Sequence, residues 1–437
     1  MEPVTQSAIV ACGILAVFLA IGIPIGVVLA IAGMAGIIIF TGRVDTTAFC
    51  LPFLQSVQVT TTYSFLVIPM FMLLGELAAG IGLSKDLFDT SYRWLGNFRG
   101  GLAISTVVTC AGMASITGSS VATAAAMTKI ALPELREHKY KDELSVGTIT
   151  VGGTLAIMIP PSITLVVYAI FAEQSIGKLL MAGILPGFLI GTLYTLLIIL
   201  RCQLQPSLGP RGPKFSLREK LLSLTKVGPF LLLILTILLG ILFGIWTPVE
   251  ASGVGVIVVL VMGLVRRRIK LRALIASIIE AVVSSASVMI LIIGAFVFAR
   301  YLAISGLNVS IINTIFGWDL SPFSLFLTIV FLYIILGMFL DPASMQALTI
   351  CLLVPVITAQ GWSLIWFGVI VVSLIEIGLV TPPVGLNLYA VKAAAPELPL
   401  QLIYFSCIPF WLCNIVAIII LYFVPDIALM LPNMMIR

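Results

Sequence analysis

The chain has 437 residues, of which 61% are hydrophobic and only 9% are charged, and its net charge is +5. No soluble domain of this length could bury so much apolar surface, so the composition excludes a water-soluble globular protein. Apolar runs of about 17 to 25 residues instead predict an all-α polytopic membrane protein. A membrane β-barrel is excluded because the sequence lacks alternating ten-residue segments.

The positive charge is concentrated in two loops. Residues 201–226 hold six, and residues 266–272 hold five, of the 23 lysines and arginines. The positive-inside rule places both loops in the cytoplasm. The apolar stretches between them, 228–245 and 249–265, are just long enough to cross a membrane and return, which agrees with that placement. Basic loops beside spans are ordinary topology signals, so we expect no nucleic-acid partner.

The first half begins with an apolar run, 8–40, which Gly22-Ile23-Pro24 interrupts. This pattern predicts two spans or one kinked pair. Residues 41–62 are more polar and leave a partly re-entrant path open. A span is predicted over 63–80, and residues 84–99 are amphipathic, as in a helix that lies in the membrane interface.

Two interruptions are predicted in the rest of this half. A helix rich in small residues ends at Gly118-Ser119-Ser120, and a serine can cap the next helix, so we predict a hairpin near 117–133. Pro160-Pro161 removes two backbone donors and stops the preceding helix, so we predict a broken helix near 159–162. The basic segment 201–227 is rich in Pro and Gly and is predicted to be a cytoplasmic linker.

The second half, 228–437, repeats the plan of residues 1–200. A hairpin is predicted near 337–355 and a second broken helix near 378–387. Pairs related by the same shift of 222 residues are Pro161 and Pro383, Ser119 and Asp341, and Pro133 and Pro355. Among membrane proteins, an interruption at matching places in two repeats is the best sequence indication of a transporter binding site.

Each double proline offers free carbonyl groups before the break and free N–H groups after it. Carbonyls suit hard cations such as sodium, whereas helix N-termini suit carboxylates. The alternative is that each Pro-Pro only kinks a span, but two at matching positions favour a site. The candidate sodium- or substrate-binding residues are Gly118, Ser119, Ser120, Thr154, Ile159, Pro160, Pro161, Ser162, Gly337, Asp341, Gly378, Thr381, Pro382, Pro383, Gly385 and Asn387.

The charged residues of interest within apolar segments are Asp341, Glu76, Arg300 and Glu376. Asp341 could help to bind a cation or cap the helix that starts at Pro342, and the two roles are compatible. Glu76 and Arg300 occupy matching positions and could form an ion pair, or Arg300 could contact an anionic substrate; a purely structural role is the alternative. Glu376 lies one turn before the second break and is expected to stabilise it or to face water.

The sequence shows no apparatus for catalysis. Its seven cysteines are scattered without a C-x-x-C pair, and it has a single histidine. We therefore expect no transition metal, haem, other cofactor or disulfide framework. No Ser/His/Asp arrangement, H-E-x-x-H or Walker motif is present, so an enzyme is not expected.

Several motifs together carry a family resemblance over nearly the whole chain. They are Thr117-Gly118-Ser119-Ser120, Ile159 to Ser162, Ser175-Ile176-Gly177, Ala182 to Gly187, Thr247 to Ala251, Gly337 to Asp341, and Glu376 to Leu388. In this order they resemble the large membrane subunit of tripartite ATP-independent periplasmic (TRAP) transporters. Two small departures are Thr117, where serine is usual, and Lys139-Tyr140, where Gly-Tyr is common.

The resemblance implies a sodium-driven importer in a bacterial or archaeal inner membrane. It implies two inverted repeats with re-entrant hairpins and broken helices, which form an elevator-type transport domain that slides against a scaffold. It also implies three partners: a carboxylate substrate, a periplasmic binding protein that delivers it, and a separate small four-helix membrane subunit. Sodium would sit among the carbonyls and hydroxyls of the hairpins and broken helices, with the substrate between the hairpin tips.

Two alternatives remain open at this point. A sodium–dicarboxylate symporter could share the repeat and the hairpins but would bind its substrate without a binding protein. A membrane enzyme or a channel is disfavoured by the missing catalytic residues and by the paired broken helices. The substrate is open among C4-dicarboxylates, sugar acids and keto acids.

Overall fold

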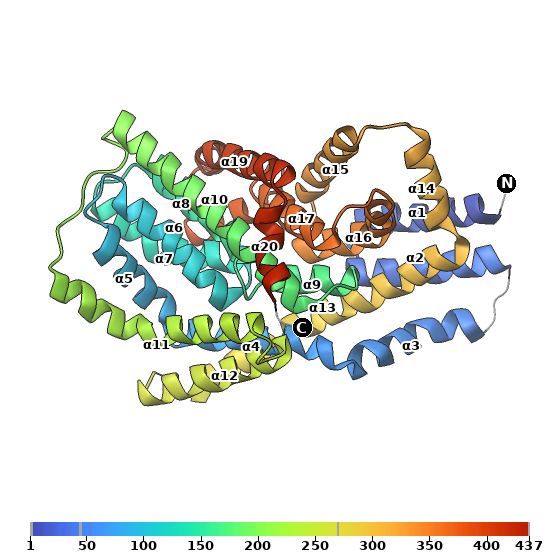
Figure 1. Ribbon diagram of the computed structural model, residues 1–437, viewed down its shortest axis with the longest axis horizontal. Helices are drawn as coiled ribbons and strands as arrows, with labels where there is room; N and C mark the ends of the chain where they lie inside the picture. Colours follow the sequence, from blue (N-terminus) through green and yellow to red (C-terminus); the bar gives the residue numbers. More distant parts are fainter. Residues whose placement is uncertain (1–2, 43–45, 269–270, 436–437) are drawn as a thin grey trace.

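The computed structural model describes residues 3–42, 46–268 and 271–435, except for the side chains of 3, 46–49, 52 and 114–117. Within this part of the chain, every regular element is a helix (Figure 1). Eight of the helices are long and apolar enough to cross a membrane. The prediction of an all-α polytopic membrane protein is therefore confirmed.

The helices of the first half follow one another through short turns, with a 3₁₀ turn before α4 and another after α8. They are α1 (Pro3–Ile21), α2 (Ile25–Thr41), α3 (Thr46–Thr61), α4 (Val67–Gly80), α5 (Leu83–Leu95), α6 (Gly101–Thr117), α7 (Ser120–Glu137), α8 (Asp142–Gly152), α9 (Ile163–Phe171) and α10 (Ile176–Leu204). The apolar run 8–40 thus forms two helices, and Gly22 with φ 85° makes the break between them.

The second half contains the remaining helices. They are α11 (Leu217–Leu242), α12 (Pro248–Val265), α13 (Leu271–Ser305), α14 (Leu307–Gly317), α15 (Pro322–Gly337), α16 (Pro342–Ala359), α17 (Leu364–Leu379), α18 (Leu386–Ala394), α19 (Leu400–Phe423) and α20 (Asp426–Met434). The hairpin α15–α16 and the broken helix α17–α18 occur in the same order as α6–α7 and α8–α9 in the first half.

Matched residues occupy matched places in the two halves. Gly82 and Gly306 both have positive φ and stand directly before α5 and α14. Pro133 and Pro355 both lie inside the second arm of a hairpin, in α7 and α16. The fold is therefore built from two repeats, each with a helical hairpin and a broken helix.

The segment between the halves is shorter than the predicted linker 201–227. Residues 201–204 belong to α10, residues 217–227 belong to α11, and only 205–216 connect the two helices. The reason is a capping box. The Ser216 hydroxyl accepts from the Glu219 N–H at 3.2 Å, and the Glu219 carboxylate accepts from the Ser216 N–H at 2.7 Å. This cap starts α11 well before the apolar run begins.

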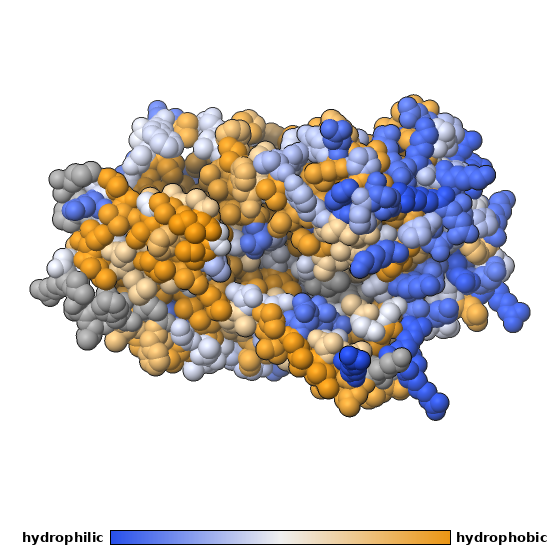
Figure 2. Space-filling view, turned by 180° about the vertical axis from the view of Figure 1, so that it is seen from behind, coloured by the Kyte–Doolittle hydropathy of each residue, from blue (hydrophilic) through white to orange (hydrophobic). Residues whose placement is uncertain are grey.

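The two basic segments lie together at one end of the molecule, as the there-and-back pair of α11 and α12 requires, because Arg266 donates to the Lys226 carbonyl at 2.5 Å. Arg268 donates to the Asp86 carboxylate of α5 at 2.7 Å, and Arg266 lies 3.4 Å from the same carboxylate. Figure 2 shows that hydrophilic residues gather toward the end where α5 to α8 lie in Figure 1, while apolar residues cover much of the remaining visible face.

The longest described helix, α13, packs along α2, and glycines let the two backbones approach closely. A Cβ atom at Gly294 would lie 1.8 Å from the Gly26 carbonyl oxygen, and one at Gly33 would lie 3.0 Å from the Phe298 Cα. Small residues let helix backbones approach closely where lipid supplies no hydrophobic drive for association. The pair α2–α13 therefore forms a close-packed frame, and α4 packs beside it on α13.

We predict that Gly294→Ala destabilises the protein, because its methyl group would collide with backbone that cannot rotate away. The expected cost is about 1–3 kcal/mol. Thermal unfolding of the purified protein in detergent measures it. Gly191→Ala in α10 is the matched control, since a Cβ there meets nothing within 4 Å. That variant should melt at or above the wild-type temperature, because Ala favours a helix over Gly by about 1 kcal/mol. Equal melting temperatures for the two variants would contradict the close-packed frame.

Candidate functional site

The tip of the first hairpin is a two-residue turn between α6 and α7. Gly118 has φ 55°, a conformation that suits glycine, and its Cα faces the Ile163 side chain at the start of α9. Ser119 is the N-cap of α7, and its hydroxyl accepts from the Ala122 N–H at 3.4 Å. The side chain of Thr117, the first residue of the predicted tip, lies outside the described residues. The turn places the N-terminus of α7 beside the first broken helix.

The first broken helix loses its α-helical form after Gly152. A 3₁₀ turn, Gly153–Ile157, leads to Ile159-Pro160-Pro161, and Ser162 then caps α9 by accepting from the Leu165 N–H at 3.2 Å. The Ser162 hydroxyl also donates to the Ile157 carbonyl. Thr154 is fully buried and donates to the Val151 carbonyl at 2.8 Å. Polar side chains of the segment thus satisfy backbone groups that the break has freed.

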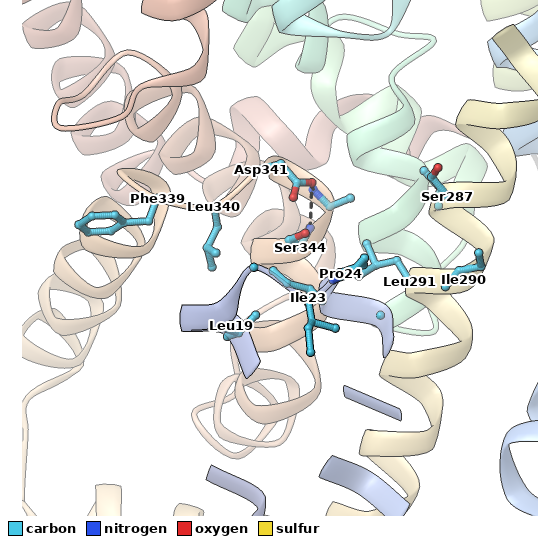
Figure 3. Close-up of a pocket in the computed structure, with 15 residues that line it drawn as sticks. Leu19, Ile23, Pro24, Ser287, Ile290, Leu291, Phe339, Leu340, Asp341 and Ser344 are labelled. Atoms are coloured by element: carbon cyan, nitrogen blue, oxygen red, sulfur yellow. Dashed lines mark hydrogen bonds between the residues drawn. The ribbon is translucent and has the colours of Figure 1, made fainter. Parts of the chain in front are cut away.

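The tip of the second hairpin is capped by a carboxylate. Asp341 Oδ2 accepts from the N–H groups of Ala343 at 3.1 Å and Ser344 at 3.2 Å, as Figure 3 shows for Ser344. The capping role suggested for Asp341 is therefore present in the structure. At the other end of the tip, Gly337 touches Gly378 of α17, because a Cβ on Gly337 would lie 2.7 Å from the Gly378 Cα. These two glycines bring the hairpin against the second broken helix.

The second broken helix ends at Leu379 and restarts at Leu386. Between them, the Thr381 hydroxyl donates to the Ile377 carbonyl at 2.6 Å and accepts from the Trp411 indole at 3.0 Å. Gly385 has φ 55° where α18 begins. Pro382 and Pro383, like Pro160 and Pro161, are joined by a cis peptide bond. Asn387 follows in the first turn of α18 and is fully buried.

Each hairpin crosses to the broken helix of the other half. The Asn387 amide donates to the Ser120 hydroxyl at 2.7 Å and to the Thr150 carbonyl at 3.2 Å, which joins α18 to the first hairpin and to α8. In the reciprocal crossing, Gln346 of the second hairpin donates to the Thr164 carbonyl of α9 at 3.1 Å. Each crossing uses one buried amide, which lies on the broken helix in the first crossing and on the hairpin in the second.

Both crossing amides leave an oxygen without a partner. Asn387 Oδ1 and Gln346 Oε1 are buried and accept no hydrogen bond within the described residues. A buried acceptor left unsatisfied costs about 1–3 kcal/mol, so such atoms mark places where an ion, a water molecule or a ligand is expected. Oxygen atoms are the ligands that hard cations take.

Glu376 is a third buried group of this kind. It is fully buried in α17, and neither carboxyl oxygen has a hydrogen-bond partner among the described residues. Helix α17 packs against α10 and α19, where the Tyr194 hydroxyl donates to Asn414 Oδ1 at 2.6 Å. The carboxyl therefore packs inside the protein near a polar pair from α10 and α19.

Glu76 and Arg300 do not form an ion pair in the structure. The Ser277 hydroxyl of α13 donates to the Glu76 carbonyl at 3.3 Å, so Glu76 lies beside the beginning of that helix. Arg300 is on the same continuous helix 23 residues later, which corresponds to about 34 Å at the α-helical rise. Their matching positions reflect the repeat, and the acidic neighbour of Glu76 is Glu280.

The hairpin tips open into two cavities beside α13, which share Ser287 and Val288 on their walls. Ser119 lines one of about 670 Å³, together with Glu76, Glu280 and Ser287. Asp341 and Ser344 line the other, of about 440 Å³, which Figure 3 shows with Ser287 and Leu291 of α13 on its wall. The charged residues that line these two cavities are all acidic; among the described residues on their walls there is no lysine, arginine or histidine.

Sequence reasoning missed several residues of this arrangement. Gln346 and Thr164 form the second crossing, Thr150 completes the first, and Ser287 lies between the tips. The sequence contains one signal for Gln346, because it is the one amide side chain in the first turns of the helix that follows Asp341. Nothing local marks the others, because their roles depend on which helices meet.

We predict that Asp341→Ala lowers the thermal stability of the protein, whereas Asp341→Asn leaves it nearly unchanged. Alanine removes the cap of α16, at a cost of about 1 kcal/mol, but asparagine caps about as well as aspartate. Unfolding followed in detergent compares the three proteins. If asparagine destabilised as much as alanine, the negative charge rather than the cap would hold the tip.

Paired broken helices with hairpins at matching places define a secondary-transporter fold. The solved structures include one that agrees with this class. The crystal structure of the YdaH transporter of Alcanivorax borkumensis superimposes with a TM-score of 0.60, covering 99% of this chain and 98% of that chain at 15% identity. A likeness at this identity concerns the fold alone.

The family follows from sequence comparison. Residues 12–427 match the family model of the tripartite ATP-independent periplasmic transporter, DctM component. The chain is 35% identical over 372 residues to the C4-dicarboxylate TRAP transporter large permease protein DctM of Pseudomonas aeruginosa, covering 85% of this chain and 86% of the relative. It therefore belongs to the family of TRAP transporter large permeases, and the resemblance seen in the motifs is confirmed.

Other members of the family have different named substrates. The chain is 30% identical over 413 residues to the 2,3-diketo-L-gulonate permease YiaN of Escherichia coli, covering 94% of this chain and 96% of the relative. It is 27% identical over 418 residues to the sialic acid permease SiaM of Vibrio cholerae, covering 94% and 95%. These relatives are transporter permeases, in agreement with the expectation of a non-enzyme.

Proposed function

We propose that the chain is the large membrane subunit of a sodium-coupled importer of an organic acid. In this proposal, a periplasmic binding protein hands over the acid, a small four-helix membrane subunit completes the transporter, and the assembly works in the inner membrane. The observation that carries the proposal is the pair of crossings, each with a buried amide oxygen that has no partner in the described residues.

Each crossing is proposed to hold one sodium ion. Asn387 Oδ1 would supply an oxygen ligand at the first, beside the Ser120 hydroxyl and the Thr150 carbonyl. Gln346 Oε1 would supply one at the second, beside the Thr164 carbonyl. Side-chain and backbone oxygens suit a hard monovalent cation, and the unwound segments at both Pro-Pro sequences add further carbonyls.

The substrate is proposed to lie between the hairpin tips. The tip of the first hairpin is the N-terminus of α7, which the neutral Ser119 caps, so the partial positive charge of this terminus favours a carboxylate. Because the two cavities at the tips carry acidic but no basic side chains, an acid held there would need positive charge from elsewhere. Bound sodium would supply that charge, which ties the binding of the acid to the binding of the ion.

An elevator movement is part of the same proposal. The hairpins and broken helices of the two halves hold each other through the crossings, so they would move as one body. The close-packed pair α2–α13 would be the frame against which they slide. The two cavities beside α13 support this view, because each is lined by a hairpin tip and by residues of this helix.

The experiment that tests the proposal is uptake into liposomes. The chain is reconstituted with its small subunit, and uptake of radiolabelled succinate, sialic acid and 2,3-diketo-L-gulonate is measured under an inward sodium gradient, with and without the binding protein. We expect uptake of one class of acid that needs both sodium and the binding protein. Asp341→Asn and Ser119→Ala should weaken it. Uptake indifferent to the binding protein would favour the sodium–dicarboxylate symporter, and uptake indifferent to sodium would reject the coupling.

We predict that Asn387→Ala and Gln346→Ala raise the sodium concentration for half-maximal uptake by about tenfold. Loss of one oxygen ligand that contributes about 1–2 kcal/mol to the free energy of sodium binding corresponds to such a change. The sodium dependence of uptake measures it at saturating acid. Asn313→Ala and Gln401→Ala are matched controls, since both side chains are exposed and neither takes part in the hydrogen bonds of the crossings. An unchanged sodium dependence in both crossing variants would remove the proposed ion sites.

A further inference from the structure

A polar stretch in the middle of α13 has no role so far. Ser284, Ser285 and Ser287 lie near the centre of a 35-residue helix that is otherwise mainly apolar. Serine is tolerated there because its hydroxyl can bond back to the preceding turn, as Ser285 does to the Ala281 carbonyl at 2.6 Å and Ser287 to the Val283 carbonyl at 3.0 Å.

The three serines face two ways. Ser285 is buried and also donates to the Met72 sulfur of α4 at 3.2 Å, so it belongs to the packing between the two helices. Ser284 and Ser287 are three residues apart, which puts both on one face of α13. That face borders the cavity that contains Ser119, since Ser284 and Ser287 both line it, and residues of α4 line the same cavity.

Ser287 lines both cavities. It contributes to the wall of the one that contains Ser119 and to the wall of the one that contains Asp341, where Figure 3 shows it on α13 above Leu291. One turn of α13 therefore faces the tips of both hairpins. The other α13 residues on these walls are Glu280, which is acidic, and Ala281, Val283, Val288, Ile290 and Leu291, which are apolar.

We propose that Ser284 and Ser287 form the α13 wall of the substrate site and determine its specificity. They bind the part of the organic acid that points away from the hairpin tips. A hydroxyl both donates and accepts, so this wall suits an acid whose far end carries a hydroxyl or a keto group, whereas Glu280 one turn before Ser284 disfavours a second carboxylate there. An acid with an apolar far end gains nothing from it. This inference rests on the proposed function, because it places the substrate between the same tips.

The first test compares KM and kcat in the complete reconstituted transporter with its binding protein. The probe is whichever of succinate, sialic acid and 2,3-diketo-L-gulonate the wild type transports. We expect Ser287→Ala to raise KM about fivefold, and the double variant with Ser284→Ala to raise it further, as for the loss of neutral hydrogen bonds. The value of kcat and the sodium dependence should stay near those of the wild type. Ser285→Ala is the control and should leave KM unchanged.

The second test does not depend on kinetics. Ser287→Cys is treated with a small charged methanethiosulfonate, and labelling at that position is read by mass spectrometry. Labelling should slow when the transported acid and sodium are both present. Val282→Cys, exposed on α13 and outside both cavities, should label at the same rate with and without the acid.

The outcomes separate the two proposals. If the wild type takes up no acid under a sodium gradient, the proposed function fails first. If the wild type transports but Ser287→Ala keeps its KM and the acid gives Ser287→Cys no protection, the α13 wall is rejected. A shift in KM that Ser285→Ala shares equally would also reject it, since it would report on helix packing alone.

Discussion

Backbone groups that a helix leaves unpaired must find polar partners when no water is at hand, and this constraint shapes the centre of the molecule. Two hairpin tips and two broken helices create such groups. Serine, aspartate and threonine side chains answer most of them locally, as Ser119, Ser162 and Asp341 cap the helices that follow. Two buried side-chain oxygens that keep no partner among the described residues, Asn387 Oδ1 and Gln346 Oε1, lie where a hairpin meets the broken helix of the other half.

The places of the breaks follow directly from local chemistry. Proline, glycine and a capping residue act within one turn of the chain, so the Pro-Pro sequences, the tip at Gly118 and the cap at Asp341 could be predicted from the sequence. The internal repeat strengthened each of them by its counterpart. The class of protein could be predicted for a similar reason, since the apolar runs leave few alternatives.

Contacts between distant helices could not be predicted in this way. The hydrogen bonds from Asn387 to Ser120 and from Gln346 to Thr164 depend on how the two repeats pack against each other. The predicted pairing of Glu76 with Arg300 is wrong because it assumed that matching positions are neighbours in space. A repeat places equivalent residues at equivalent sites of its two halves, and these sites are far apart. The segment between α10 and α11 is shorter than its composition predicts, because the capping box at Ser216 starts α11 among polar residues.

The crossings also mean that the sequence halves are not the functional halves. Each proposed ion site takes ligands from both repeats, so an ion in either site would order parts of both. If the first ion orders a hairpin and so raises the affinity of the protein for the second ion, the second ion raises the affinity for the first by the same factor, because coupling between sites is reciprocal. Cooperativity between the ions would then need no chain of intermediate residues, since each repeat contributes residues to both crossings.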